Sequence, residues 1–189
     1  RKFVWPRHRK RLTHMKGHKM QWTQLWHAQS FPLWVEGNDA TPRMHRVMIG
    51  GDRAGAVVVA RNDQGAFALV RQRRLAIERD LWEFPRGMSE GSDVDGIATG
   101  LRELLEETGF HGENGISLGQ IYPDSGILGR HIEVIACTVP EQKRGEIDGE
   151  VDALQWVGLD ELRSMIVSGE LQDSITLAAF TLWKTHNEA

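Results

Sequence analysis

Three carboxylates within five residues form the group in this sequence best suited to chemistry. Glu103, Glu106 and Glu107 are spaced three and four residues apart in the segment Arg102–Phe110. On a helix, where each residue turns the chain by about 100°, their side chains share one face. The apolar residues of the same stretch lie on the opposite face: Ile97, Ala98, Leu101, Leu104 and Leu105. Like charges at these spacings destabilise a helix by about 0.2–0.5 kcal/mol per pair, and a bound cation would turn this repulsion into attraction. An isolated group of this kind is, however, usually a solvated helix face.

The helix that carries these carboxylates has recognisable limits. Ser92, followed by Asp95 three residues later, resembles a capping box, and Gly109 stands where a helix commonly ends. A strand-like run, Leu81–Phe84, comes before it and ends at Pro85. The sequence therefore predicts a strand, then a loop, then the carboxylate helix.

Strands and helices alternate through the rest of the chain. Two short runs flank the turn Asn62–Gly65 and predict a hairpin. The predicted strands span 55–60, 66–71, 116–122, 131–139 and 153–157, and the predicted helices span 159–167 and the stretch from an N-cap at Asp173 to about 185. Strands interleaved with three helices indicate the α/β class, as a sandwich with a mixed β-sheet.

Length and composition favour one domain with an appended N-terminal segment. The chain has 189 residues and a formal net charge of −3, which allows one substantial core. Residues 1–20 are basic and lack apolar periodicity, so we expect a disordered leader rather than a nucleic-acid-binding arm. Residues 21–54 contain three tryptophans and predict an extension that packs on the domain or on a partner subunit. The domain itself is predicted to span 55–189.

Cysteine content and hydropathy bear on the cellular compartment. Cys137 is the only cysteine, so an intrachain disulfide and a multi-cysteine zinc site are excluded. No run approaches the roughly 18 apolar residues that cross a membrane, and the basic N-terminal stretch lacks the features of a secretory signal. We therefore expect a cytoplasmic protein that binds neither membrane nor nucleic acid.

The segment around the carboxylates resembles the Nudix box. That motif reads G-x5-E-x7-R-E-U-x-E-E-x-G-U, with U aliphatic or aromatic, and Arg102–Phe110 matches its second half at every specified position. Val70–Arg74, Leu81–Pro85 and Gly169–Thr176 are similar to the framework of the ADP-ribose and nucleotide-sugar pyrophosphatase branch of the Nudix hydrolases. The resemblance covers about 55–183 and implies a Nudix-type α/β/α sandwich with a mixed β-sheet.

The first half of the box departs from the motif. Its Glu should stand at the position of Val94, which Asp93 and Asp95 flank, and its Gly is Gly87, one residue earlier than the motif requires. In the family this Glu supports the motif arginine, which is Arg102 here. The resemblance implies that Asp93 or Asp95 takes over that support, or that the pair is missing.

The resemblance also implies a metal site. Glu103, Glu106 and Glu107 are the expected metal-binding and catalytic carboxylates, joined by the backbone carbonyl of Arg86, where the branch usually has Ala. Mg²⁺ is a hard cation that prefers oxygen ligands, and Mn²⁺ is a possible substitute. Bound there, the ion would orient a diphosphate and lower the pKa of an attacking water.

The general base is expected in the acidic loop before the last strand. The resemblance offers Glu146, Asp148 and Glu150, and Glu150 has the family-like spacing to Trp156. A solvated acidic loop is the alternative interpretation of these three residues.

Four further residues are candidates for contact with substrate. Arg71 and Arg73 follow a strand and would hold a diphosphate or a ribose through forked hydrogen bonds, unless they are ordinary surface arginines. Glu83 is a further candidate beside the metal. Tyr122 is the first residue of the segment with which the family recognises its substrate. There it would stack on a base or face the core.

These residues predict a Mg²⁺-dependent hydrolase that cleaves the pyrophosphate bond of a nucleoside diphosphate linked to another group. ADP-ribose or an ADP-sugar is the leading substrate, giving AMP and a sugar phosphate. ADP-ribose-specific members tend to carry Pro where this chain has Ser125, so dinucleoside polyphosphates, NADH, coenzyme A and damaged nucleotides are alternatives. A non-catalytic nucleotide-binding module is a further alternative, disfavoured because all three carboxylates are present. The branch resemblance implies a homodimer in which the N-terminal extension reaches the neighbouring subunit.

Overall fold

The computed structural model describes residues 21–38, 44–50, 54–140, 145, 149 and 151–188. Its elements are β1 (Trp22–His27), β2 (Leu33–Asn38), β3 (His45–Ile49), β4 (Gly55–Asn62), β5 (Phe67–Arg74), β6 (Arg79–Glu83), β7 (Arg86–Gly87), α1 (Gly96–Thr108), β8 (Glu113–Ile121), β9 (Ile132–Val139), β10 (Ala153–Val157), α2 (Leu159–Ser168) and α3 (Ser174–Glu188). The predicted strands and helices of the domain are each found, with ends that differ by a few residues.

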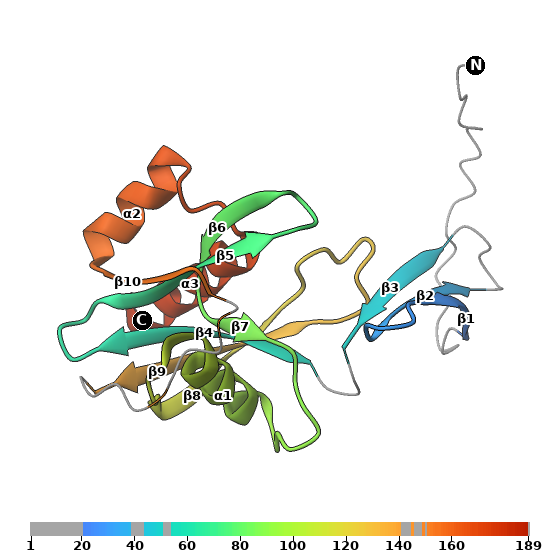
Figure 1. Ribbon diagram of the computed structural model, residues 1–189, viewed down its shortest axis with the longest axis horizontal. Coiled ribbons are helices and arrows are strands. Elements are labelled where there is room, and N and C mark those ends of the chain that lie inside the picture. The colour runs from blue at the N-terminus through green and yellow to red at the C-terminus, as the bar shows by residue number, and fades with distance from the viewer. Residues whose placement is uncertain are drawn as a thin grey trace.

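Seven of these strands form one mixed sheet. Its order is β10-β5-β4-β9-β8, with β6 paired to β5 and β7 paired to β4. β4 and β9 run parallel in register over the whole of both strands, and the other neighbours are antiparallel. β4 therefore lies at the centre of the sheet, and the short strand β7 brings the chain just before α1 against the start of β4 (Figure 1).

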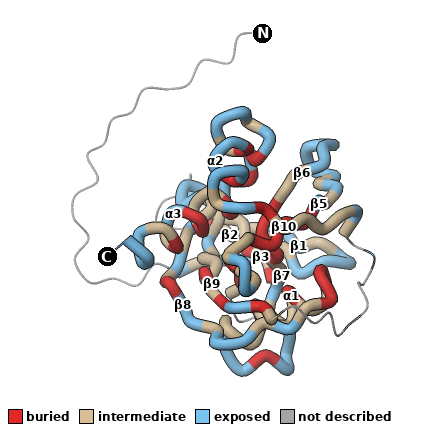
Figure 2. Tube along the Cα trace, turned by 90° about the vertical axis from the view of Figure 1, so that its left-hand side faces the viewer, coloured by how far each residue is buried: buried red, intermediate tan, exposed pale blue. Residues whose placement is uncertain are grey.

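Helices cover both faces of this sheet. Along β4, Val57 and Val59 belong to the apolar cluster that includes α3 and α2, while Ala56, Val58 and Ala60 belong to the cluster under α1. Successive residues of a strand point to opposite faces, so a strand buried on both faces is apolar throughout. In Figure 2 buried stretches appear in strands and helices of the interior, while the outer turns are largely exposed. The predicted α/β/α sandwich with a mixed sheet is confirmed.

α1 begins later than its capping signal suggested. The prediction of Ser92 as the N-cap is wrong, because the helix starts at Gly96 and Asp95 caps it by accepting a hydrogen bond from the Ala98 N–H at 2.8 Å. Residues 90–93 form a turn instead, which the hydrogen bond from the Asp93 N–H to the Glu90 carbonyl closes at 3.1 Å. The predicted C-terminal stop is correct: Gly109 has φ 72°, a left-handed conformation that Gly adopts without strain.

The N-terminal extension forms its own antiparallel sheet, β1-β2-β3, which lies to one side of the sandwich (Figure 1). It contacts the domain through β3. The Val47 N–H donates to the Ile127 carbonyl at 2.8 Å, and the Gly129 N–H donates to the Val47 carbonyl at 2.9 Å. The extension therefore packs on the loop 122–130 of its own chain. The leader predicted at 1–20 lies outside the described residues.

No helix of the described chain is long and apolar enough to cross a membrane.

Candidate active site

Two of the three motif carboxylates pack against the peptide between β6 and α1. The Glu103 side chain lies directly over Gly87, so closely that a Cβ on residue 87 would overlap the carboxylate. The Arg86 N–H donates to Oε2 of Glu107 at 3.2 Å. Two carboxylates of one helix face therefore converge on the 86–87 peptide, which β7 holds against β4.

The third carboxylate of the motif has a different environment. The Glu106 side chain is 40% exposed and accepts a hydrogen bond from Arg102 at 2.7 Å, one helical turn earlier. Glu107 is buried, and the Glu103 side chain is 13% exposed. The predicted shared face is thus divided into a buried pair and a more exposed member, and Arg102 contacts Glu103 at 3.0 Å as well as Glu106.

Electrostatics make the buried pair receptive to a cation. The pKa of Glu107 is raised to about 8, chiefly by burial and also by the charge of Glu103, against the opposing effects of the Arg86 N–H and the charges of Arg74 and Arg86. A pKa raised this far means that nearby groups do not fully compensate the ionised carboxylate. A divalent cation between Glu103 and Glu107 would supply the missing compensation.

The donor set suits a hard divalent ion that keeps part of its water shell. Within the described residues, no group of three or more His, Cys, Asp or Glu side chains is arranged to hold a metal by itself. Mg²⁺ commonly uses only one or two carboxylates and completes its shell with water and phosphate oxygens. Glu103, Glu107 and the Arg86 carbonyl fit that requirement, and their roles as ligands stay predictions.

Arg102 holds the loop that leads into α1. Its guanidinium donates to Asp93 at 3.1 and 3.3 Å and to the Met88 carbonyl at 2.7 Å. Asp93 also accepts hydrogen bonds from the Glu90 N–H and the Thr99 hydroxyl. The hydrogen bond from Arg102 is the main reason why the pKa of Asp93 lies below its usual value, and it outweighs the opposing effect of burial.

Of the two aspartates that could support Arg102, Asp93 is therefore the one that contacts it. Asp95 is committed to the helix cap. Val94, at the position where the motif has Glu, is 79% exposed. The box keeps an acid–arginine pair although the acid stands one residue away from the motif position.

A second ion-pair network lies beside the 86–87 peptide. Glu83, which is fully buried, accepts hydrogen bonds from Arg74 at 2.9 Å and from Arg86 at 2.9 Å. Arg86 also donates to Asp173 at 3.3 Å. Glu107 lies within electrostatic range of both arginines. The structure thus places Glu83 beside the 86–87 peptide, together with Arg74 and Asp173, which sequence reasoning did not assign to the site, and the role of Glu83 beside a metal stays a prediction.

The alternation of β5 explains which of its arginines reach this network. Phe67 and Leu69 pack on the α3 face, so Arg71 and Arg73 point to that face as well, whereas Arg74 points to the α1 face. The Arg71 guanidinium lies 5.8 Å from the Trp82 ring, and Arg73 forms an exposed ion pair with Asp80 at 3.1 Å. The structure does not bring Arg71 and Arg73 to the carboxylates, and their contact with substrate stays a prediction. Strand alternation, which places Arg71 and Arg73 on the face of Phe67 and leaves Arg74 on the other face, is the signal that could have singled out Arg74.

Tyr122 stands at the start of the loop 122–130. It is 59% exposed and makes an edge-to-face contact with His131, with 5.9 Å between ring centroids. A core-facing position is therefore excluded, and its ring is accessible for stacking. The three candidates for the general base, Glu146, Asp148 and Glu150, lie outside the described residues.

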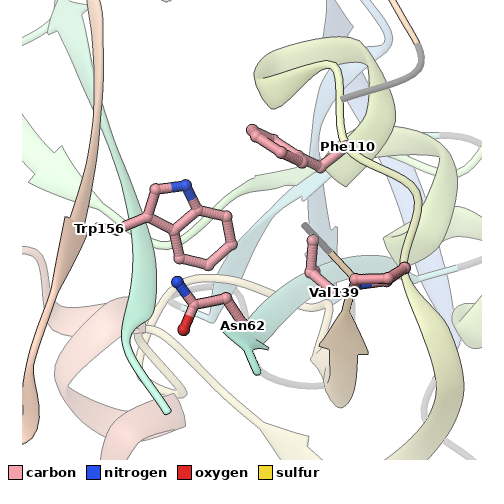
Figure 3. Close-up of a pocket in the computed structure, with 5 residues that line it drawn as sticks. Asn62, Phe110, Val139 and Trp156 are labelled. Atoms are coloured by element: carbon pink, nitrogen blue, oxygen red, sulfur yellow. The ribbon is translucent and has the colours of Figure 1, made fainter. Parts of the chain in front are cut away.

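A separate shallow pocket of about 250 Å³ lies at the other end of β4 from the carboxylates. Figure 3 shows the Trp156 and Phe110 rings and the Asn62 side chain around it, and Val139 and Pro140 complete the lining. The two rings meet edge to face at 5.5 Å between centroids. None of the acidic residues described above lines this pocket.

The fold and the site together define a class: an α/β/α sandwich with a cluster of carboxylates on one face of a helix. Comparison with known proteins identifies the class further. Residues 51–178 match the NUDIX domain model. An ADP-ribose pyrophosphatase of Bacillus subtilis (strain 168) is 31% identical over 129 residues, covering 66% of this chain and 69% of that protein. An ADP-ribose pyrophosphatase of Mycobacterium tuberculosis (strain ATCC 25618 / H37Rv) is 29% identical over 131 residues, covering 66% and 62%.

A solved structure described as an ADP compounds hydrolase superposes with a TM-score of 0.69, at 17% identity, over 91% of this chain and 97% of that one. At that identity the likeness concerns the fold alone. The family match covers most of the chain, so the protein belongs to the NUDIX family and is a pyrophosphohydrolase. Nudix hydrolases generally need a divalent metal ion.

Proposed function

We propose that the protein uses Mg²⁺, or Mn²⁺ in its place, to hydrolyse the pyrophosphate bond of ADP-ribose or of an ADP-sugar, giving AMP and a sugar phosphate. The observation that carries the proposal is the convergence of Glu103 and Glu107 on the 86–87 peptide. The names of the two bacterial relatives support ADP-ribose as the substrate. The Ser125 position, where ADP-ribose-specific members tend to have Pro, keeps ADP-sugars within the proposal.

The position of each residue in the site indicates its role. Glu103, Glu107 and the Arg86 carbonyl would hold the cation, which when bound neutralises the diphosphate and lowers the pKa of a water molecule. Glu106, held by Arg102, lies at the exposed edge of the same helix face and is suited to a cation that arrives with the substrate. Arg74 contributes positive charge on this face of the sheet. Glu150 is proposed as the base that takes a proton from the attacking water.

The test is release of AMP from ADP-ribose in the presence of Mg²⁺. Glu107→Gln and Glu103→Gln each keep the shape of the side chain and remove the charge, so each should lower kcat by about a hundredfold or more. Glu113→Gln, an exposed glutamate on β8, is the matched control and should turn over like the parent protein. Unchanged turnover in both site variants would refute the metal assignment.

The substrate needs its own experiment. A panel of ADP-ribose, ADP-sugars, dinucleoside polyphosphates, NADH and coenzyme A, with products separated by chromatography, ranks them by kcat/KM. A higher value for any compound outside the ADP-ribose and ADP-sugar class would replace the proposed substrate and leave the hydrolase assignment intact.

We also propose that the protein is a homodimer formed through the extension. β1–β3 and the turns that join them expose several large apolar side chains, as expected for an interaction surface: Leu25, Trp26, Phe31 and Met44. Light scattering after size exclusion should give twice the monomer mass, and a monomeric Trp26→Glu variant would place the contact on β1.

A further inference from the structure

We propose that the Arg86 side chain is a positioning residue that fixes the 86–87 peptide for metal binding by bridging Glu83 and Asp173. The inference rests on the proposed function, because it concerns the same metal site. It adds a role for the Arg86 side chain to the expected role of its backbone carbonyl.

The bridge joins two parts of the chain that are far apart in sequence. Arg86 Nε donates to Glu83 Oε2 at 2.9 Å, and its Nη2 lies 2.8 Å from the same oxygen. Nη2 also donates to Oδ1 of Asp173 at 3.3 Å. A planar guanidinium with several fixed donors is suited to holding two carboxylates in one geometry.

Both partners of Arg86 are themselves held firmly. Glu83 is fully buried and accepts two further hydrogen bonds from Nε and Nη2 of Arg74. Asp173 caps α3 by accepting from the Thr176 N–H and hydroxyl, both at 2.8 Å. The Phe84 N–H then donates to the Thr176 hydroxyl at 3.0 Å, which closes a ring of contacts between the end of β6 and the start of α3.

The backbone of the same residue is bound on its other sides. The Arg86 N–H donates to Glu107 on α1, and residues 86 and 87 pair with Val57 and Ala56 of β4. Arg86 therefore connects α1, β4, β6 and the start of α3 through one residue. Sites that bind metal or substrate require their groups to be held within about 0.5 Å by surrounding contacts. The Arg86 side chain is well placed to provide that constraint on the peptide that faces Glu103 and Glu107.

Charge and positioning predict opposite effects of removing the side chain. The Arg86 charge lies within range of Glu107 and favours its ionised form, but it also repels an incoming cation. If charge repulsion alone mattered, an uncharged residue would leave the affinity for a divalent cation unchanged or increase it, and if the charge acted only by keeping Glu107 ionised, Arg86→Lys would bind the cation like the parent. If positioning matters, the affinity must fall although a repulsive charge has been removed.

The experiment measures Mn²⁺ binding to the full chain without substrate, by the loss of the free-ion signal in electron paramagnetic resonance. Arg86→Met keeps the length of the side chain and should weaken Mn²⁺ binding by about tenfold, the usual effect of losing a contact that orients a metal ligand. Arg86→Lys keeps the charge but not the fork, and should recover only part of the loss. Arg163→Met, which removes an exposed arginine paired with Asp160, is the control and should bind like the parent.

A second variant covers the case in which Arg86→Met does not fold. Asp173→Asn removes the charge that Arg86 contacts, while Asn is as good an N-cap as Asp, so α3 keeps its start. It should weaken Mn²⁺ binding by about threefold, a smaller effect because Glu83 still holds Arg86. With substrate, both variants should lower kcat more than they raise KM.

Unchanged or tighter Mn²⁺ binding in folded Arg86→Met, or in Asp173→Asn if the former does not fold, would overturn the inference. Failure of the inference is distinguishable from failure of the proposed function. A parent protein that binds Mn²⁺ but cleaves no ADP compound would refute the function and leave the positioning test valid. An active parent whose variants bind Mn²⁺ normally would refute the inference alone.

Discussion

Two arginines hold the two ends of the loop 86–95, and they differ in where their partners come from. Arg102 anchors the loop through Asp93 near its end and also contacts the Met88 carbonyl, all within one loop and the helix that follows it. Arg86 anchors the start of the loop through Glu83 and through Asp173, which is 87 residues away along the chain. One anchor is local and the other depends on the tertiary fold.

The difference explains how the loop tolerates its departure from the motif. Between the two anchored ends the chain is largely exposed: Gly91 has open space where a Cβ would be, and Val94 points to solvent. A change of one residue in this stretch needs no rearrangement of the core. What must be kept is the contact at each end, and Asp93 keeps one of them with a side chain that is one methylene shorter than Glu.

The largest expected effect comes from filling the space over the 86–87 peptide. In Gly87→Ala the new Cβ would occupy the position of the Glu103 carboxylate, which must swing away. The moving group is the end of a flexible side chain, so the fold should persist. A displacement of about 1 Å in such a site commonly costs about a hundredfold in rate, and we expect a loss of that size in kcat for hydrolysis of ADP-ribose.

Gly91→Ala is the matched control for this substitution, because it lies in the same loop and meets no neighbour. Its turnover and its thermal unfolding should equal those of the parent. Should Gly87→Ala retain full activity, the Glu103 carboxylate would not need its present position, and the site geometry described above would be wrong.

The next effect tests the local anchor. Asp93→Asn removes the charge that Arg102 contacts in a nearly buried position, and hydrogen bonds between charged groups contribute about 1.5–3 kcal/mol. We expect the free energy of unfolding in urea at about pH 7 to fall by about that amount. Asp93 carries a lowered pKa in the folded protein, so its contribution is present above the unfolded value of about 3.9 and disappears as the pH falls through the folded value.

The stability difference between the parent and Asp93→Asn should therefore shrink as the pH falls below the unfolded value and vanish at a pH below the lowered pKa of Asp93, if both are still folded there. A difference in stability that persists at that pH would mean that the pair is not ionic. Adding Val94→Glu to Asp93→Asn should restore nothing, since residue 94 points to solvent. If Val94→Glu restored the free energy of unfolding, the position of the acid in the motif, and not the contact between Asp93 and Arg102, would decide which residue binds Arg102.

Contacts between residues close in sequence could be predicted from the sequence, and contacts made by the tertiary fold could not. The motif half Arg102–Phe110, six of the seven strands of the domain sheet and the Gly109 stop depend on neighbours along the chain, and they were predictable, whereas β7 and the strands β1–β3 of the extension were not predicted. Arg74 was harder, because three arginines within four residues look alike until strand alternation is combined with knowledge of which face α1 covers. The contact between Arg86 and Asp173 was not predictable, since no local pattern states that the start of α3 lies beside β7.

The smallest expected effect concerns the cap that the sequence placed three residues too early. Asp95 and Ser92 are both good N-cap residues, and the chain uses Asp95 because Asp93, two residues earlier, must remain in the loop to reach Arg102. Asp95→Ala should reduce the free energy of unfolding by about 1 kcal/mol, while Ser92→Ala should change it by less than about 0.5 kcal/mol. Because Glu103 and Glu107 lie two and three turns further along α1, the Mn²⁺ affinity of Asp95→Ala should equal that of the parent. A loss of Mn²⁺ affinity in this variant would show that the first turn of the helix, and not only the two arginine anchors, holds the carboxylates in place.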